Sequence, residues 1–197
     1  MLYIITGGSG SGKSEYAENL AVDLFQGSSK RQNGTGRDFG KAVLYYLATM
    51  YPYDEESRQR IERHQIQRAG KGFTTKECPV KLEQVNAKEG DVLLLEDLSN
   101  LLANEMYLES GRIKARHVCR TQSQLEQAIL FPLLDLEKQA GNVIIVTNEI
   151  FADGVEYDEE AKWYIGLLGQ INQKLAGAAD GVIEVVCGIP LWHKGKI

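Results

Sequence analysis

The sequence predicts an α/β fold in which helices flank a mostly parallel sheet. Short apolar runs rich in β-branched residues end in polar residues or glycine, and helical patterns separate them, which is typical of βαβ units. The length of 197 residues suits one domain with a single core. We therefore expect one domain over residues 1–197, with strands at Leu2–Thr6, Ala42–Thr49, Asp91–Leu98, Asn142–Glu149 and Gly181–Gly188.

Helical periodicity fills three of the intervals between these strands. Apolar residues recur on one face of Lys13–Phe25 and of Ser123–Gln139, and a third long helix is expected from about Asp158 to Ala178. The segment from Gln26 to Lys41 is rich in Gly, Ser and charge and has no such period. We interpret it as a surface loop at about residues 26–41 within the domain.

Composition and charge exclude several classes of protein. Apolar residues make up 43% and charged residues 25% of the chain, which is ordinary for a globular protein and excludes a disordered one. The net charge of −5 argues against a nucleic-acid partner and leaves room for small anions. Three widely spaced cysteines indicate reduced thiols, and the apolar N-terminal run is too short for a signal peptide. We expect a cytoplasmic protein with no membrane segment.

The stretch GGSGSGKS directly follows the first expected strand and directly precedes the first expected helix. It fits the phosphate-loop pattern G-x-x-x-x-G-K-[ST], in which backbone N–H groups surround phosphates, Lys reaches the β and γ oxygens, and Ser binds Mg²⁺. A flexible Gly/Ser turn is the alternative, but the strand and helix on either side favour the phosphate loop. The residues expected to bind nucleotide phosphates are Gly7, Gly8, Ser9, Gly10, Ser11, Gly12, Lys13 and Ser14.

Two further strands should deliver polar residues to the same edge, because the carboxyl ends of parallel strands meet there. Glu96 and Asp97 end the run VLLLED, so we expect Glu96, with Ser14, to hold Mg²⁺. Asp97 either shares that task or caps a helix that begins near residue 98. The polar residues at 147–149 either orient a substrate or cap a loop, and the sequence leaves both readings open.

The segment from Asp54 to Arg68 predicts a polar helix with too few apolar residues to be part of the core. Arg60, His64 and Arg68 are spaced i, i+4, i+8, which places them on one face. Neighbouring positive charge keeps an imidazole neutral, so His64 could attack phosphorus while the arginines bind a triphosphate. A histidine on a polar helix can also be an ordinary surface residue.

Together these pieces resemble the bifunctional adenosylcobinamide kinase / adenosylcobinamide-phosphate guanylyltransferase family of cobalamin assembly. The matching stretches are TGGSGSGKS, LATMYPYDEESRQRIERHQIQR with FTTKE, VLLLED, VTNE and GQINQKLAGAADGVIEVVCGIPLWHK. The resemblance implies a P-loop fold with a RecA-like, mostly parallel sheet. It also implies ATP or GTP with Mg²⁺ as cofactor, a corrinoid as substrate, and a homo-oligomer, a trimer in this family.

The resemblance also implies roles for single residues. His64 falls on the family's guanylylated histidine, so His64 and Lys13 are the expected catalytic residues. The other positions expected to contact the nucleotide or its metal are Thr49, Met50, Arg60, Arg68, Glu77 and Glu96.

The chain departs from the family pattern in three places. Gly10 stands where the family usually has Arg, Ile150–Asp153 (including Phe151 and Asp153) replaces a glycine-rich stretch, and Ile165-Gly166 replaces an Arg-Asp pair. These changes remove a phosphate contact and alter backbone where a corrinoid would approach. The alternatives are therefore a P-loop kinase or nucleotidyltransferase acting on another small molecule, and a GTP-binding protein without catalysis.

Overall fold

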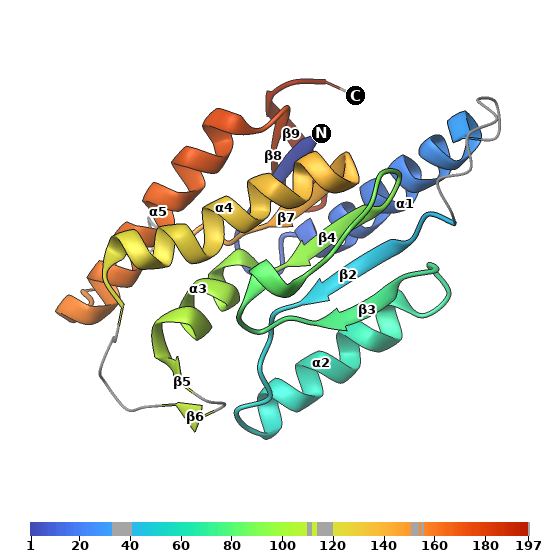
Figure 1. The fold of residues 1–197 in the computed structure, drawn as a ribbon. Coiled ribbons are helices and arrows are strands. Elements are labelled where there is room, and N and C mark those ends of the chain that lie inside the picture. Colours follow the sequence, from blue (N-terminus) through green and yellow to red (C-terminus); the bar gives the residue numbers. More distant parts are fainter. Residues whose placement is uncertain (33–40, 110–111, 114–119, 151–153, 155, 197) are drawn as a thin grey trace.

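One sheet of seven strands forms the centre of the computed structural model, which describes residues 1–32, 41–109, 112–113, 120–150, 154 and 156–196 (Figure 1). The strand order is β3-β2-β4-β7-β1-β8-β9, and every pairing is parallel except that of β8 with β9. The expected α/β fold is confirmed. The strands are β1 Leu2–Thr6, β2 Leu44–Ala48, β3 Thr74–Glu77, β4 Val92–Glu96, β7 Asn142–Val146, β8 Gly181–Val186 and β9 Ile189–Lys194.

Helices cover both faces of this sheet. Helix α1 packs on one face, α3, α4 and α5 pack on the other, and α2 lies beside the outer strand β3 (Figure 1). A short strand pair, β5 Leu108–Glu109 and β6 Arg112–Ile113, follows α3, and a 3₁₀ turn at Leu82–Gln84 follows β3. The helices are α1 Lys13–Gln32, α2 Glu55–Arg68, α3 Leu98–Tyr107, α4 Gln122–Ala140 and α5 Glu159–Ala178.

Alternation along the buried strands builds the two halves of the core. In β1, Leu2 and Ile4 pack with the α3–α5 layer, while Tyr3 and Ile5 pack with the α1 layer. A strand covered on both faces is apolar at every position, because neither face meets water. The central strands therefore occur in the sequence as continuous apolar runs.

Local signals set the ends of the helices. The side chains of Asp54, Thr121 and Asp158 each accept a hydrogen bond from a backbone N–H in the first turn of α2, α4 and α5. Thr121 and Gln124 form a reciprocal capping box. Gly141 ends α4 with a φ of 87°, a conformation that glycine adopts without strain.

The structure corrects the sequence prediction at the end of the first helix. Helix α1 runs on to Gln32, so residues 26–32 of the expected surface loop are helical, and residues 33–40 lie outside the described part of the chain. These seven residues lack apolar periodicity, but Lys, Arg and Gln have good intrinsic helix propensity, so the helix can continue through them. The prediction of a loop at 26–41 is therefore wrong for residues 26–32.

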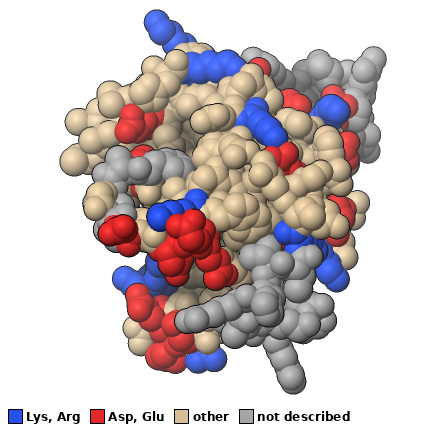
Figure 2. Space-filling view, turned by 90° about the vertical axis from the view of Figure 1, so that its left-hand side faces the viewer, with Lys and Arg blue, Asp and Glu red and all other residues tan. Residues whose placement is uncertain are grey.

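Positive and negative side chains are mixed on the face of the molecule in Figure 2. On the described surface of the face in Figure 2, Lys and Arg lie dispersed among Asp and Glu and form no continuous basic patch. Among the described residues, no helix is both long enough and apolar enough to span a bilayer.

Candidate functional site

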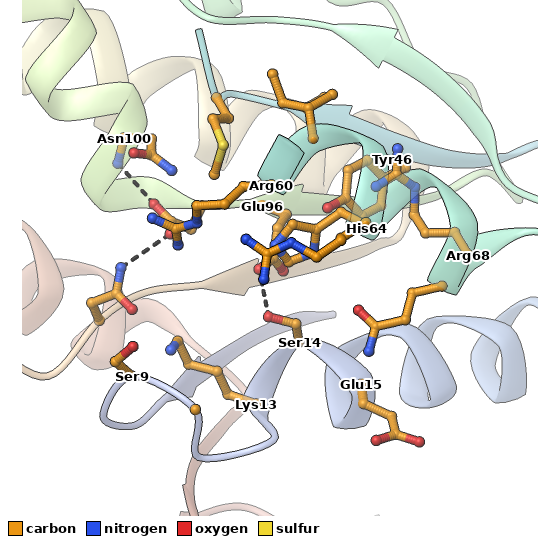
Figure 3. Close-up of a pocket in the computed structure, with 18 of the residues that line it drawn as sticks. Ser9, Lys13, Ser14, Glu15, Tyr46, Arg60, His64, Arg68, Glu96 and Asn100 are labelled. Carbon is orange, nitrogen blue, oxygen red and sulfur yellow. Dashed lines mark hydrogen bonds between the residues drawn. The ribbon is translucent and has the colours of Figure 1, made fainter. Parts of the chain in front are cut away.

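A cleft of about 840 Å³ opens at the carboxyl ends of β1, β2 and β4. The phosphate loop and the start of α1 form one wall, and α2 forms the other (Figure 3). Ligands bind at this edge of open α/β sheets because successive loops converge there. The cleft therefore joins the two stretches that the sequence singled out, GGSGSGKS and the polar helix.

The phosphate loop connects β1 to α1, and residues 9–14 line the cleft. The turn of the β8–β9 hairpin contacts the loop, because the Gly188 N–H donates a hydrogen bond of 2.8 Å to the Ser11 carbonyl oxygen. Gly7 lies behind the loop, where an added Cβ would stand 2.5 Å from the Val185 carbonyl oxygen. The loop is thus held against the sheet by close backbone packing that only glycine permits at residue 7.

Lys13 is the cation that the loop itself provides. Its Nζ donates a hydrogen bond of 3.1 Å to the Gly8 carbonyl oxygen across the loop. Burial lowers the pKa of this ammonium group, although the nearby Glu96 carboxylate acts in the opposite direction. A phosphate oxygen could take the place of the carbonyl, because the ammonium group has three donors in rotatable positions.

Ser14 and Glu96 form the centre of the expected metal site. The Ser14 Oγ donates a hydrogen bond of 2.6 Å to Glu96 Oε1, while the buried Oε2 has no partner among the described residues (Figure 3). Burial, and next the neighbouring Asp97, raise the pKa of Glu96 to about 8. A carboxylate with an unsatisfied buried oxygen beside a hydroxyl is a donor set that suits a hard divalent cation.

The same donors fit Mg²⁺ better than a transition metal. No group of three or more His, Cys, Asp or Glu that could hold a metal ion occurs in the described ranges. Mg²⁺ keeps several waters and takes its remaining ligands from one or two protein oxygens and from substrate phosphates. Ser14 and Glu96 supply that minimum.

Asp97 is occupied as a helix cap. Its Oδ1 accepts hydrogen bonds from the Asn100 N–H at 2.7 Å and the Ser99 Oγ at 2.6 Å, at the start of α3. Its Oδ2 accepts one of 3.0 Å from Asn148 Nδ2. Of the two readings that the sequence left open, the geometry favours capping, with Asn148 and Asn100 bordering the cleft.

Eight residues of helix α2 line the cleft, and four of them are basic side chains, where an ordinary packed helix would present apolar ones. Of its residues, Arg68 alone is buried, and its guanidinium lies 3.6 Å from the centroid of the Tyr46 ring. His64 is half-buried, one turn before Arg68, and Arg60 and Arg63 are exposed. Figure 3 shows Arg60 and His64 on the side of the cleft opposite Lys13 and Ser14. The helix is attached to the sheet by a cation–π contact instead of an apolar stripe.

The surroundings of His64 keep its imidazole neutral. Burial lowers the pKa of His64 most, and Arg60 and then Arg68 lower it further, while Glu18 on α1 acts in the opposite direction. Its Nδ1 is buried and has no hydrogen-bond partner among the described residues. A neutral imidazole facing a phosphate loop is a competent nucleophile toward phosphorus.

The structure brings together most of the residues that the sequence predicted. The cleft is lined by Met50, Arg60, His64, Arg68, Glu77 and Glu96 together with residues 9–14 of the loop. Thr49 differs from them. It is fully buried, its hydroxyl donates to the carbonyl oxygens of Glu96 and Asp97, and it accepts a hydrogen bond from the Asp97 N–H. Thr49 therefore joins β2 to β4 behind the cleft wall.

The three departures from the family pattern fall in different environments. Gly10 has a φ of +71° and open space around an added Cβ, so an arginine would fit there only in a left-handed conformation. Ile165 and Gly166 lie on α5 and are not among the residues lining the cleft. Phe151 and Asp153 lie outside the described residues.

Sequence reasoning missed several contributors to the site, among them Arg63, Tyr46 and Glu18. Tyr46 sits within an apolar strand, where nothing in the sequence marks it as the platform for Arg68. Glu18 is 2% exposed, lies one turn after Ser14 on α1, and is paired with Lys71. The only sequence signal for Glu18 is its position, an acidic residue on the inward face of the first helix.

The comparisons with known proteins cover nearly the whole chain. The model of the family described as cobinamide kinase / cobinamide phosphate guanyltransferase matches residues 3–192. The bifunctional adenosylcobalamin biosynthesis protein CobU of Escherichia coli is 30% identical over 195 residues, covering 96% of this chain and 97% of that protein. CobU of Salmonella typhimurium is 27% identical over 194 residues, with the same coverage. The flagellar accessory protein FlaH of Methanocaldococcus jannaschii aligns with a TM-score of 0.40 at 16% identity, covering 99% of this chain and 78% of that one.

Proposed function

This chain belongs to the cobinamide kinase / cobinamide phosphate guanyltransferase family, and we propose that it transfers GMP from GTP to adenosylcobinamide phosphate through a guanylylated His64. It is a transferase of cobalamin biosynthesis, as the resemblance implied. The observation that carries the histidine step is the position of His64, half-buried on α2 and facing a cleft whose other wall is the phosphate loop.

The first step uses the neutral imidazole. A ring nitrogen of His64 attacks the α-phosphorus of GTP, a P–N bond forms, and the bond to the bridging oxygen of the β-phosphate breaks. Pyrophosphate leaves with that oxygen. Lys13 and the backbone N–H groups of the loop would take the growing charge on the leaving group, because these groups bind the β- and γ-phosphates in a phosphate loop and residues 9–14 line the cleft that His64 faces.

The second step reverses the roles. A phosphate oxygen of adenosylcobinamide phosphate attacks the same phosphorus, a P–O bond forms, and the P–N bond breaks to return neutral His64. Arg60 and Arg68 flank His64 along α2 and line the same cleft, so they would stabilise charge on the transferred group. Ser14 and Glu96 would hold Mg²⁺, which supplies charge neutralisation on phosphate oxygens.

The same loop suits the kinase reaction of the family. Lys13 would bind the β- and γ-phosphates of ATP or GTP while the hydroxyl of adenosylcobinamide attacks the γ-phosphorus. A new P–O bond forms, the bond from the γ-phosphorus to the bridging oxygen breaks, ADP or GDP leaves with that oxygen, and the hydroxyl proton goes to solvent. Gly10 offers no side chain to the phosphates, so Lys13 carries more of this task here than in a loop that also has arginine. The corrinoid acceptor and a homo-oligomer, a trimer in this family, belong to the same proposal.

Radiolabel from GTP tests the histidine step directly. Incubation with α-labelled GTP and Mg²⁺ should place an acid-labile label on the protein, and His64→Ala should abolish it. His193→Ala is the matched control, since His193 lies exposed on β9 and bonds to Glu184 at 2.8 Å, outside the cleft lining. Label that survives His64→Ala, or no label on the wild-type protein, would refute the assignment. Turnover with cobinamide compared with other small alcohols tests the acceptor.

A further inference from the structure

Helix α2 carries the proposed nucleophile yet has almost no apolar attachment of its own. Its two isoleucines do little, because Ile66 is 69% exposed and Ile61 is only partly buried. A helix is normally positioned by an apolar stripe against the core. Apart from the stacking of Arg68 on Tyr46, the place of His64 relative to the phosphate loop must therefore be set by contacts just outside the helix.

The first such contact lies just before α2. Tyr53 precedes the helix cap, and its hydroxyl donates a hydrogen bond to Asn104 Oδ1 on α3. Asn104 is 1% exposed, and its Nδ2 donates to the carbonyl oxygens of Thr49 at 2.7 Å and Pro79 at 2.9 Å. One amide side chain thus fixes the chain leaving β2, the chain leaving β3 and the entry to α2.

The second contact lies just after α2. Lys71 Nζ forms an ion pair of 2.7 Å with Glu18 Oε2 on α1 and a hydrogen bond of 3.3 Å with Asn19. The Glu18 side chain is 3% exposed, so this pair is shielded from water on the acidic side. Helix α1 begins at the phosphate loop, so the pair ties the end of α2 to the element that also carries Lys13 and Ser14.

We propose that Tyr53–Asn104 and Lys71–Glu18 are two latches that position α2, and with it His64, over the phosphate loop. None of these four residues lines the cleft, so they are positioning residues that act through α2. The catalytic consequence rests on the proposed role of His64. Because each latch holds a different end of the helix, their effects should combine.

Single-turnover labelling of His64 at saturating α-labelled GTP tests this consequence. Tyr53→Phe and Lys71→Ala should each lower the maximal labelling rate about fivefold, the factor expected when one hydrogen bond or partly buried ion pair is lost, and the double variant should lower it by about the product. Lys71→Arg should restore the rate to within twofold. Lys174→Ala and Tyr3→Phe are matched controls, since they remove a lysine ion pair with Glu126 and a tyrosine hydrogen bond far from α2.

Amide hydrogen exchange of α2 provides a readout that needs no chemistry at His64. Exchange in α2 should become severalfold faster in Tyr53→Phe and Lys71→Ala, with α4 unchanged and with neither control affecting α2. Unchanged α2 exchange together with unchanged labelling rates would overturn the latches, as would an effect confined to the half-saturating GTP concentration. If the wild-type protein takes no label, the proposed function fails, and the exchange measurement alone decides the latches.

Discussion

Three glycines of the phosphate loop should respond very differently to the same substitution. At Gly7 an added Cβ would lie 2.5 Å from the Val185 carbonyl oxygen and 2.6 Å from Ser11 Oγ. At Gly8 and Gly10 nothing lies within 4 Å, but Gly10 has a φ of +71°. The same substitution therefore meets steric crowding at Gly7, backbone strain at Gly10 and open space at Gly8.

The expected changes in the free energy of unfolding follow from these environments. Gly8→Ala should stabilise the protein by about 0.4–1 kcal/mol, because alanine restricts the unfolded chain and meets no obstacle. Gly10→Ala should destabilise the protein by about 1 kcal/mol. This is the cost of a Cβ in a left-handed conformation minus the same gain from restricting the unfolded chain. Gly7→Ala should cost about 2–4 kcal/mol, since the Val185 strand must move and the backbone is strained as well.

Urea unfolding of the nucleotide-free protein, followed by circular dichroism, measures these values if the slope with denaturant stays constant. A loss of 2–4 kcal/mol corresponds to a fall in melting temperature of about 4–16 °C for a chain of this size. Equal stabilities for Gly7→Ala and Gly8→Ala would refute the packing argument. A stable Gly10→Ala variant would refute the left-handed conformation of the loop at that residue.

Three further predictions concern titration and reactivity. Since the pKa of His64 is lowered, the rate of its guanylylation should stay level as the pH falls to about 6.5 and decline only below it; a decline already near pH 8 would contradict a neutral imidazole. The pKa of Glu96 is raised to about 8 from an unfolded value of 4.5, so the metal-free native state binds one more proton than the unfolded state between these pH values. The free energy of unfolding should therefore fall as the pH rises through that window, and Glu96→Gln should flatten this pH dependence in urea unfolding. Thiol labelling with mass-spectrometric mapping should find Cys187 reactive and Cys78 protected, because Cys78 is buried and its pKa is raised to about 11. Equal labelling of both thiols would show that the native fold opens around Cys78.

The sequence was sufficient for the buried strands and insufficient for the two edges of the sheet. Strands β1 and β4 are apolar up to their last residues, Thr6 and Glu96, so their pattern in the sequence is unambiguous. Strand β3 has the sequence TTKE, and β9 begins Ile-Pro and alternates partly exposed residues. Edge strands face solvent and lack a continuous apolar run, so periodicity carries little information about them.

The candidate site shows the same division between local and distant information. The phosphate loop and the stripe of Arg60, His64 and Arg68 are local patterns, and the structure places both in one cleft. The burial of Thr49 and the stacking of Arg68 on Tyr46 depend on how β2 pairs with β4 and where α2 lies. Such contacts join residues that are far apart in the sequence, so the spacing of residues along the chain does not predict them.

The distribution of positive charge explains why the placement of α2 matters so much in this chain. Lys13 is the only cationic side chain among residues 7–14, and Gly10 adds none. The remaining cations of the cleft, Arg60, Arg63 and Arg68, all lie on α2. A triphosphate bound at the loop thus meets its second set of positive charges on the helix that bears His64. Displacing that helix would separate the proposed nucleophile and these three arginines from the phosphates together, which is the reason we propose the two latches at the ends of α2.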